Sequence, residues 1–216
     1  MLKYILLDLD GTLLDTTELI LESYRYTFRT YLGHAVPDEE VLSGFGTPLY
    51  QQLGRFVSEG IEEMMATYRT FNLAHHDRMV SVFPGVRETL SELADRGIKM
   101  AIVTSKTRYA SQVGLDLFGL SPFISFLVCV EDTERHKPDS QPVLKALDLL
   151  GASPEEALFV GDSPHDMTAG HAAGVKTAAA LWGPFAKDVV LASSPDFTLN
   201  SFPDLLPILD KIQAES

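Results

Sequence analysis

The sequence predicts an α/β fold in which a parallel sheet is flanked by helices and a helical segment is inserted. Three observations support this. Short apolar runs recur along the chain, amphipathic helical patterns separate them, and one long segment near the N-terminus interrupts the alternation. Alternating strands and helices are typical of a doubly wound, Rossmann-like sheet with right-handed crossovers. At 216 residues the chain is long enough for a core domain that carries a smaller one.

The predicted strands are five short runs that are nearly continuous in apolar residues. Such runs are typical of parallel strands buried on both faces. They are residues 4–8 (YILLD), 99–105 (KMAIVTS), 126–132 (FLVCVED), 157–162 (ALFVGD) and 176–181 (KTAAAL). Two intervening segments, 86–97 and 140–151, have the apolar spacing of amphipathic helices, with Gly97 as a helix stop and Ser140 as an N-cap.

Residues 16–81 break this alternation. The segment shows helical patterns with turn signals at "GHAVPD" and "GFGTP", and it contains no convincing strand. The simplest explanation is a helical module inserted after the first strand. The sequence therefore predicts an α/β core over residues 1–15 and 82–216 and a helical cap over residues 16–81.

Composition and charge limit the range of functions. The net charge of −13, from 17 Lys and Arg against 30 Asp and Glu, argues against binding to nucleic acid or to an anionic membrane. No apolar stretch approaches the ~20 residues of a membrane span, and the N-terminal apolar run, which ends in aspartates, lacks the pattern of a signal peptide. The single cysteine, Cys129, excludes an intrachain disulfide. These features predict a cytoplasmic protein and leave its oligomeric state open.

Carboxylates gather at the ends of the predicted strands. Asp8 and Asp10 follow the first strand, and Asp162 follows the fourth, with Asp166 soon after it. The carboxyl ends of parallel strands meet at the crevice where open α/β sheets bind ligands. Carboxylate oxygens are ligands that Mg²⁺ prefers, and a bound metal would relieve the repulsion between the two neighbouring aspartates. The sequence therefore predicts a Mg²⁺ site built from these four residues.

Two further segments, and the turn after the first strand, bring residues suited to a phosphoryl group to the same edge. Thr104 and Ser105 end the second strand, and Lys137 follows the third strand after a short loop. Lys137 supplies a point charge, Thr104 a neutral donor, and Gly11 a tight turn whose backbone N–H groups can face an anion. These residues predict binding of a small phosphorylated substrate beside the metal.

Together the segments resemble the four motifs of the haloacid-dehalogenase superfamily, in order and in approximate spacing. The matching stretches are DLDGT (8–12), VTS (103–105), the lysine of KPDSQP (137–142) and VGDSPHD (160–166). The predicted insertion at 16–81 resembles the helical cap of that superfamily. The resemblance implies a hydrolase with an α/β core and an inserted helical cap.

The resemblance also implies a role for each motif residue. Asp8 would be the nucleophile that forms an aspartyl-phosphate, and Asp10 would protonate the leaving group and then activate water. Thr104 and Lys137 would hold the transferred phosphoryl group and stabilise its charge. An aspartate at position 10 favours the phosphatases of the superfamily over its dehalogenases.

For the metal, the resemblance distinguishes direct from indirect ligands. Asp8, the main-chain carbonyl of Asp10 and the side chain of Asp162 would contact Mg²⁺. Asp166 would support the ion by positioning its surroundings.

A finer resemblance concerns the substrate. Residues 68–77, 136–150 and 195–212 resemble the PpaX-type inorganic pyrophosphatases of the phosphoglycolate-phosphatase-like subgroup, which implies hydrolysis of pyrophosphate. One alternative is a phosphatase of phosphoglycolate or another small phosphomonoester. Another is a non-catalytic phosphate-binding module, which the full set of motif residues disfavours.

The second phosphate of pyrophosphate requires cations beyond Lys137. The nearest candidates in the predicted cap, judged by position in the sequence, are Arg69, His75, His76 and Arg78.

Overall fold

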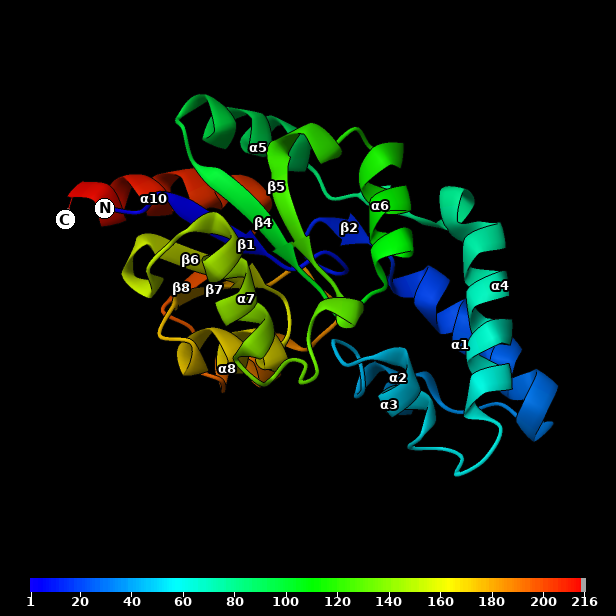
Figure 1. Cartoon of the computed structure of the whole chain (residues 1–216). Coiled ribbons are helices and arrows are strands. Elements are labelled where there is room, and N and C mark those ends of the chain that lie inside the picture. Colours follow the sequence, from blue (N-terminus) through cyan, green and yellow to red (C-terminus); the bar gives the residue numbers. More distant parts are fainter. Residues whose placement is uncertain (215–216) are drawn as a thin grey trace.

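The computed structural model describes residues 1–214, and a six-stranded sheet lies at its centre (Figure 1). The strands lie in the order β5-β4-β1-β6-β7-β8, and each neighbouring pair is parallel. Their bounds are Tyr4–Leu7 (β1), Lys99–Val103 (β4), Ile124–Val128 (β5), Ala157–Gly161 (β6), Lys176–Ala180 (β7) and Phe197–Leu199 (β8). The predicted α/β class is confirmed, and five of these strands overlap the five apolar runs.

Helices cover both faces of the sheet (Figure 1). One face carries α5 (Val86–Asp95), α6 (Arg108–Leu117) and α10 (Leu205–Ala214), and the other carries α7 (Gln141–Leu150) and α8 (Pro164–Ala172), with α9 (Lys187–Leu191) beside α8. In β1 the side chains of Ile5 and Leu7 join the first of these cores, and Leu6 joins the second. Successive strand residues point to opposite faces, so burial on both sides explains the continuous apolar runs.

The carboxyl end of β1 is the topological switch point of the sheet. From β1 the chain proceeds outward through β4 and β5, and it then returns to β6 on the other side of β1. Open α/β sheets bind ligands at such a point, outside the strand ends. Asp8, Thr104 and Asp162 each directly follow one of the three central strands.

The inserted segment is helical, as its pattern predicted. It forms α1 (Thr17–Leu32), α2 (Asp38–Leu42), α3 (Leu49–Leu53) and α4 (Ile61–Met79). These helices share a hydrophobic cluster around Tyr24, Phe28 and Met64, separate from the two cores on the sheet, and they lie beyond its carboxyl edge (Figure 1). The division into a core and a cap at 15/16 and 81/82 remains a prediction.

Two short strands connect the helical segment to the sheet. β2 (Leu14–Asp15) and β3 (Ser81–Val82) pair antiparallel, Leu14 with Val82 and Asp15 with Ser81. The expectation that residues 16–81 contain no strand was therefore wrong at Ser81. A strand of two residues is too short for alternation to reveal it in the sequence.

The ends of one strand and two helices can be compared with the predictions. The run 126–132 was assigned wholly to a strand, but Val130–Asp132 is a 3₁₀ turn. Ser140 occupies the N-cap position of α7 without a side-chain capping bond; instead Asp139 Oδ1 accepts a hydrogen bond from the Gln141 N–H at 2.8 Å. Gly97 ends α5 with φ +76°, as expected of a helix stop.

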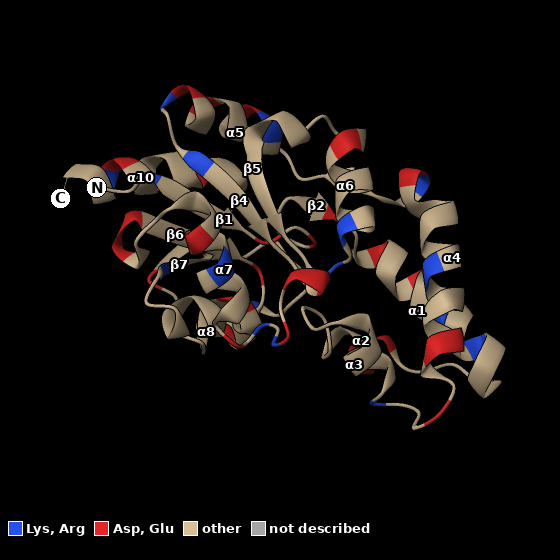
Figure 2. Cartoon of the chain, in the orientation of Figure 1, with Lys and Arg blue, Asp and Glu red and all other residues tan. Residues whose placement is uncertain are grey.

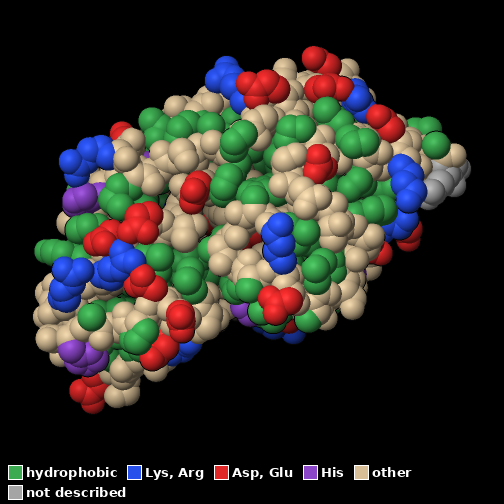
Figure 3. Space-filling model, turned by 180° about the vertical axis from the view of Figure 1, so that it is seen from behind, with side chains coloured by type: hydrophobic (Ala, Val, Ile, Leu, Met, Phe, Trp, Pro, Cys, Tyr) green, Lys and Arg blue, Asp and Glu red, His purple; other side chains and the backbone are tan. Residues whose placement is uncertain are grey.

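Lys, Arg, Asp and Glu residues lie mainly in the helices and loops, whereas the strands carry few (Figure 2). On the face seen in Figure 3, acidic, basic and hydrophobic side chains are interspersed. Among residues 1–214, no helix has both the length and the apolar character needed to cross a membrane.

Candidate active site

Asp8 and Lys137 form a buried ion pair at the switch point. Lys137 Nζ lies 2.9 Å from Asp8 Oδ1 and 2.7 Å from Asp166 Oδ1, and it donates a hydrogen bond to the Val103 carbonyl at 3.1 Å. The lysine is 2% exposed and Asp8 is 5% exposed. A lysine with every proton directed at a protein acceptor has a fixed position, so it also fixes the orientation of the Asp8 carboxylate.

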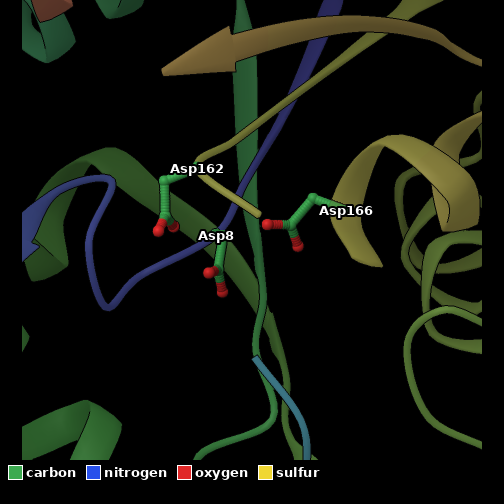
Figure 4. A group of neighbouring side chains, drawn as sticks. All are labelled: Asp8, Asp162 and Asp166. Carbon is green, nitrogen blue, oxygen red and sulfur yellow. The ribbon is translucent and has the colours of Figure 1, made fainter. Parts of the chain in front are cut away.

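Three buried carboxylates converge here. Asp8, Asp162 and Asp166 each offer an oxygen, and these oxygens lie within 4.8 Å of one another. Figure 4 shows that they come from separate segments, the ends of β1 and β6 and the first turn of α8. Among the described residues, Lys137 is the cation in ion-pair contact with this cluster. The cluster therefore holds more negative than positive charge.

Burial, together with this excess of negative charge, shifts the pKa values of the groups in the cluster. Burial raises the pKa of Asp8 to about 7; Lys137 counteracts it, and the charge of Asp166 adds to it. Burial, followed by the charge of Asp8, raises the pKa of Asp162 well above its usual range. Burial alone would lower the pKa of Lys137, but the charges of Asp166 and Asp8 outweigh it and raise that pKa. Buried carboxylate oxygens that lack sufficient counter-charge are a donor set that fits a hard divalent cation.

The two aspartates that follow β6 are held differently. Both oxygens of Asp166 are engaged, since Oδ1 contacts Lys137 and Oδ2 accepts hydrogen bonds from Ser163 Oγ at 2.6 Å and Ser163 N at 3.1 Å. Ser163 is also the N-cap of α8, so Asp166 is fixed by the helix start. Asp162 accepts a hydrogen bond from Thr12 at Oδ1, 3.2 Å away. These contacts are consistent with the implied distinction between a direct and an indirect ligand, which stays a prediction.

Asp10 lies outside the carboxylate cluster. Its Oδ1 accepts hydrogen bonds from Thr16 Oγ1 and Lys106 Nζ, both at 2.8 Å. Its side chain lines the main cavity rather than the metal candidate site. Sequence reasoning missed Lys106, although the residue directly follows the VTS motif at the end of β4 and so belongs to the same sheet edge.

Gly11 leaves room for Asp162. Its φ is +81°, and a Cβ at this position would lie 2.5 Å from Asp162 Oδ2, so a side chain is excluded both by backbone conformation and by space. The Gly11 N–H donates to the Leu14 carbonyl at 2.8 Å. The Gly11 N–H is therefore engaged within the turn. It is not one of the anion-facing N–H groups that the sequence predicted for this turn.

The two hydroxyl groups after β4, those of Thr104 and Ser105, make different contacts. Thr104 is buried, and its Oγ1 accepts a hydrogen bond from the Lys106 N–H at 3.2 Å. Ser105 Oγ donates to the Gly46 carbonyl at 2.6 Å, which connects the sheet edge to the loop between α2 and α3. Thr104 therefore keeps its proton for a ligand, whereas the proton of Ser105 is used in this structure.

A cavity of about 590 Å³ lies between the sheet edge and helices α1, α3 and α4. It brings together most of the predicted site residues: Asp8, Asp10, Gly11, Thr104, Ser105, Lys137 and Asp162. Asp166 lies behind Lys137, fully buried, and does not line it. The convergence predicted from the sequence therefore exists in the fold.

Of the four candidate cap cations, Arg69 lines the cavity. His75 stacks on Phe71 at a second surface depression, and His76 is buried against Gly114 of α6. The expectation that these histidines face the second phosphate was wrong. Position in the sequence indicated proximity to the site, but His76 lies farther along α4, where α6 covers it.

A parallel α/β sheet with these carboxylates and one buried lysine at its switch point can hold a divalent cation and a phosphoryl group. The sequence profile of the haloacid dehalogenase-like hydrolases matches residues 5–180, and the chain belongs to this family.

Known relatives indicate which members of this family the chain resembles. The chain is 44% identical over 205 residues to the pyrophosphatase PpaX of Halalkalibacterium halodurans, a match that covers 95% of each chain. It is 43% identical over 208 residues to the pyrophosphatase PpaX of Bacillus cereus, with 96% of each chain covered. A crystal structure of a predicted phosphoglycolate phosphatase from Haemophilus somnus superposes with a TM-score of 0.85 at 26% identity, covering 96% of this chain and 98% of that one. The chain is a phosphatase of the haloacid dehalogenase type.

Proposed function

We propose that this protein is a Mg²⁺-dependent phosphohydrolase that forms an aspartyl-phosphate on Asp8 and hydrolyses inorganic pyrophosphate. The observation that supports the catalytic part best is the buried contact of Asp8 with Lys137 at the floor of the cavity, with Asp10 on its wall. The choice of pyrophosphate rests on similarity to two relatives that carry the name pyrophosphatase PpaX.

Asp8 is held ready for attack. Lys137 occupies its Oδ1, which leaves Oδ2 to form the bond to phosphorus as the bond to the leaving oxygen breaks. Lys137 and the Thr104 hydroxyl lie on the same cavity wall and would stabilise the charge on the transferred phosphoryl group. Asp10 would give a proton to the leaving group and then take one from the water that hydrolyses the aspartyl-phosphate.

The site fits Mg²⁺. Asp8, Asp162 and the main-chain carbonyl of Asp10 would hold the ion, and Asp166 would support it through Lys137 and Ser163. When bound, the ion supplies positive charge that offsets the charge of the phosphoryl group.

Removal of metal should abolish turnover. We expect activity on pyrophosphate to fall to background in excess chelator, to return with Mg²⁺, and to return poorly with Ca²⁺, whose larger and looser coordination disturbs in-line geometry. The measurement is the initial rate of phosphate release after metal-free dialysis, with each cation added back in excess over substrate. Full activity in excess chelator would contradict the metal site.

The second phosphate needs partners other than the histidines. Two cations remain on the cavity wall once Lys137 is assigned to the reacting phosphate, Lys106 beside Asp10 and the exposed Arg69 on α4. Among the described residues, Arg69 has no ion-pair partner, so it is free to bind an anion. We infer that these two residues bind the leaving phosphate.

The substrate assignment is tested by comparing pyrophosphate with phosphoglycolate at equal free Mg²⁺ and pH. We expect a higher kcat/KM for pyrophosphate, because phosphate is a weaker base than an alkoxide and leaves more readily. Arg69→Gln should lower kcat/KM for pyrophosphate about tenfold, the usual scale for one charge-assisted hydrogen bond.

Arg78→Gln is the matched control, since Arg78 lies on the same helix but outside the cavity, and it should leave the constant unchanged. If phosphoglycolate is preferred tenfold or more, the pyrophosphatase assignment is wrong and a phosphatase of small phosphomonoesters takes its place.

We infer further that residues 16–81 act as a cap that covers the site. Their separate hydrophobic cluster, the Ser105–Gly46 hydrogen bond and the cavity enclosed beneath them support this role. The cytoplasmic location and the exclusion of nucleic acid and membranes as partners stay predictions.

A further inference from the structure

The cavity above Asp8 is larger than pyrophosphate requires. Its volume of about 590 Å³ falls in the range of roughly 300–1,000 Å³ that is typical of pockets for organic ligands. At roughly 30 Å³ per water molecule it would hold about twenty waters, whereas pyrophosphate has nine non-hydrogen atoms. The cavity therefore has space for a larger substrate than pyrophosphate.

Part of the cavity wall is apolar. Polar side chains of the helical segment, Gln52, Asn72 and Arg69, also line the cavity. Six others are largely apolar and come from that segment and from the loop after β7, namely Ile20, Tyr24, Phe45, Leu49, Met65 and Phe185. The one hydroxyl among these side chains, that of Tyr24, already donates a hydrogen bond to Gln52 Oε1 at 2.7 Å. Burial raises the pKa of Tyr24 well above its usual range, so the ring stays neutral. These six side chains offer little to a highly charged ion.

Large hydrophobic side chains also line the cavity where it meets solvent. Three residues do so: Tyr50 on α3, which is 45% exposed, Leu73 on α4, which is 41% exposed, and Tyr109 on α6, which is 68% exposed. They belong to both sides of the cavity, two to the helical segment and one to the sheet side. Exposed apolar side chains that border a cavity mark a binding surface for an apolar group.

Two of the three cations that line the cavity, among the described residues, lie beside the aspartates of the sheet edge. Lys137 contacts Asp8 and Lys106 contacts Asp10, so both ammonium groups lie where the phosphoryl group reacts. Arg69 is the one further cation among the residues that line the cavity. The site thus has a charged floor for a phosphate and a largely apolar chamber, with Arg69 as its one cation among the described residues, for whatever is attached to that phosphate.

From this division we propose that the same centre also hydrolyses phosphomonoesters whose alcohol carries an apolar chain. The proposal rests on the phosphohydrolase function of the site but not on pyrophosphate as its substrate. Asp8 attacks phosphorus, the bond from phosphorus to the alcohol oxygen breaks, and that oxygen takes the proton of Asp10. Water then releases phosphate from Asp8, and its proton returns to Asp10. The alcohol stays in the apolar chamber during the first step.

A series of n-alkyl phosphates from ethyl to hexyl tests this proposal. The basicity of the leaving alcohol hardly changes along the series, so chain length alters burial and leaves the chemistry the same. We expect kcat/KM to rise about two- to fourfold with each added methylene until the chamber is filled, as burial of one CH₂ implies.

Two variants locate the binding site of the chain. Leu73→Gln should flatten the rise with chain length while changing kcat/KM for pyrophosphate by no more than about twofold, because it removes apolar surface but no charge. Leu144→Gln is the matched control, since Leu144 is 46% exposed on α7 and lies outside the cavity. Met65→Gln is a second variant. Met65 is more deeply buried than Leu73, and glutamine has nearly the volume of methionine.

A flat or falling series in a protein that hydrolyses pyrophosphate would overturn this inference and leave the proposed function intact. A rise that neither Leu73→Gln nor Met65→Gln reduces would also overturn it. If no phosphate compound is hydrolysed, the proposed function fails and the inference fails with it.

Discussion

Replacing Asp8 by asparagine is expected to lower kcat at least about a thousandfold, which corresponds to about 4 kcal/mol of barrier. The amide has nearly the shape of the carboxylate, so it fits beside Lys137, but its oxygen carries no charge and cannot form a stable bond to phosphorus. The fold should persist, since one of three crowded carboxylates is removed. The measurement is steady-state phosphate release by purified variant and wild type under saturating pyrophosphate and Mg²⁺.

Asp15→Asn is the matched control for this experiment. Asp15 lies on β2, a few residues beyond Asp8, and its Oδ1 accepts a hydrogen bond from the Thr17 N–H at 3.3 Å. It lies outside the carboxylate cluster and should leave kcat unchanged. If Asp8→Asn keeps more than about a tenth of the activity, a barrier change under 1.4 kcal/mol, then the nucleophile is another group.

The sheet could be predicted because its strands are buried on both faces. Such strands appear as apolar runs whatever the rest of the fold does, and β1, β4, β6 and β7 show this plainly. β8 at the sheet edge was missed, since its three residues, Phe197–Leu199, include one exposed side chain and form too short a run. β2 and β3 were missed for the same reason of length. Their pairing depends on two segments far apart in the chain.

The site residues at strand ends could be predicted because sheet geometry alone brings those ends together. The contacts made by the side chains could not, because they depend on packing in three dimensions. Lys106 illustrates this, since nothing in the sequence indicates that its ammonium group reaches Asp10 rather than solvent. His76 is the opposite case. Its position in the sequence indicated the site, but the packing of α4 on α6 buries it elsewhere.

Replacing Lys137 by methionine is expected to lower the free energy of unfolding by about 3–5 kcal/mol in metal-free buffer. Methionine fills most of the same space, but Asp8 and Asp166 would remain buried without the ammonium group that now lies 2.9 and 2.7 Å from them. Turnover should also fall, by about a hundredfold or more, because the charge that faces the phosphoryl group is lost. Urea unfolding in chelator measures the first effect and phosphate release with Mg²⁺ measures the second.

Lys106→Met is the matched control. It distinguishes the effect of losing a positive charge from the effect of leaving carboxylates buried without one. Lys106 also contacts an aspartate, at 2.8 Å, but the side chains of this pair are 12% and 23% exposed, so water compensates when the pair is broken. We expect that variant to lose about 1 kcal/mol or less. Added Mg²⁺ should stabilise Lys137→Met more than it stabilises the wild type, because the ion then supplies the one positive charge that reaches the carboxylates. If Lys137→Met loses no more stability than Lys106→Met in chelator, the buried carboxylates do not depend on Lys137 for their charge balance. The conclusion that Lys137 holds the Asp8 carboxylate in place would then have to be abandoned.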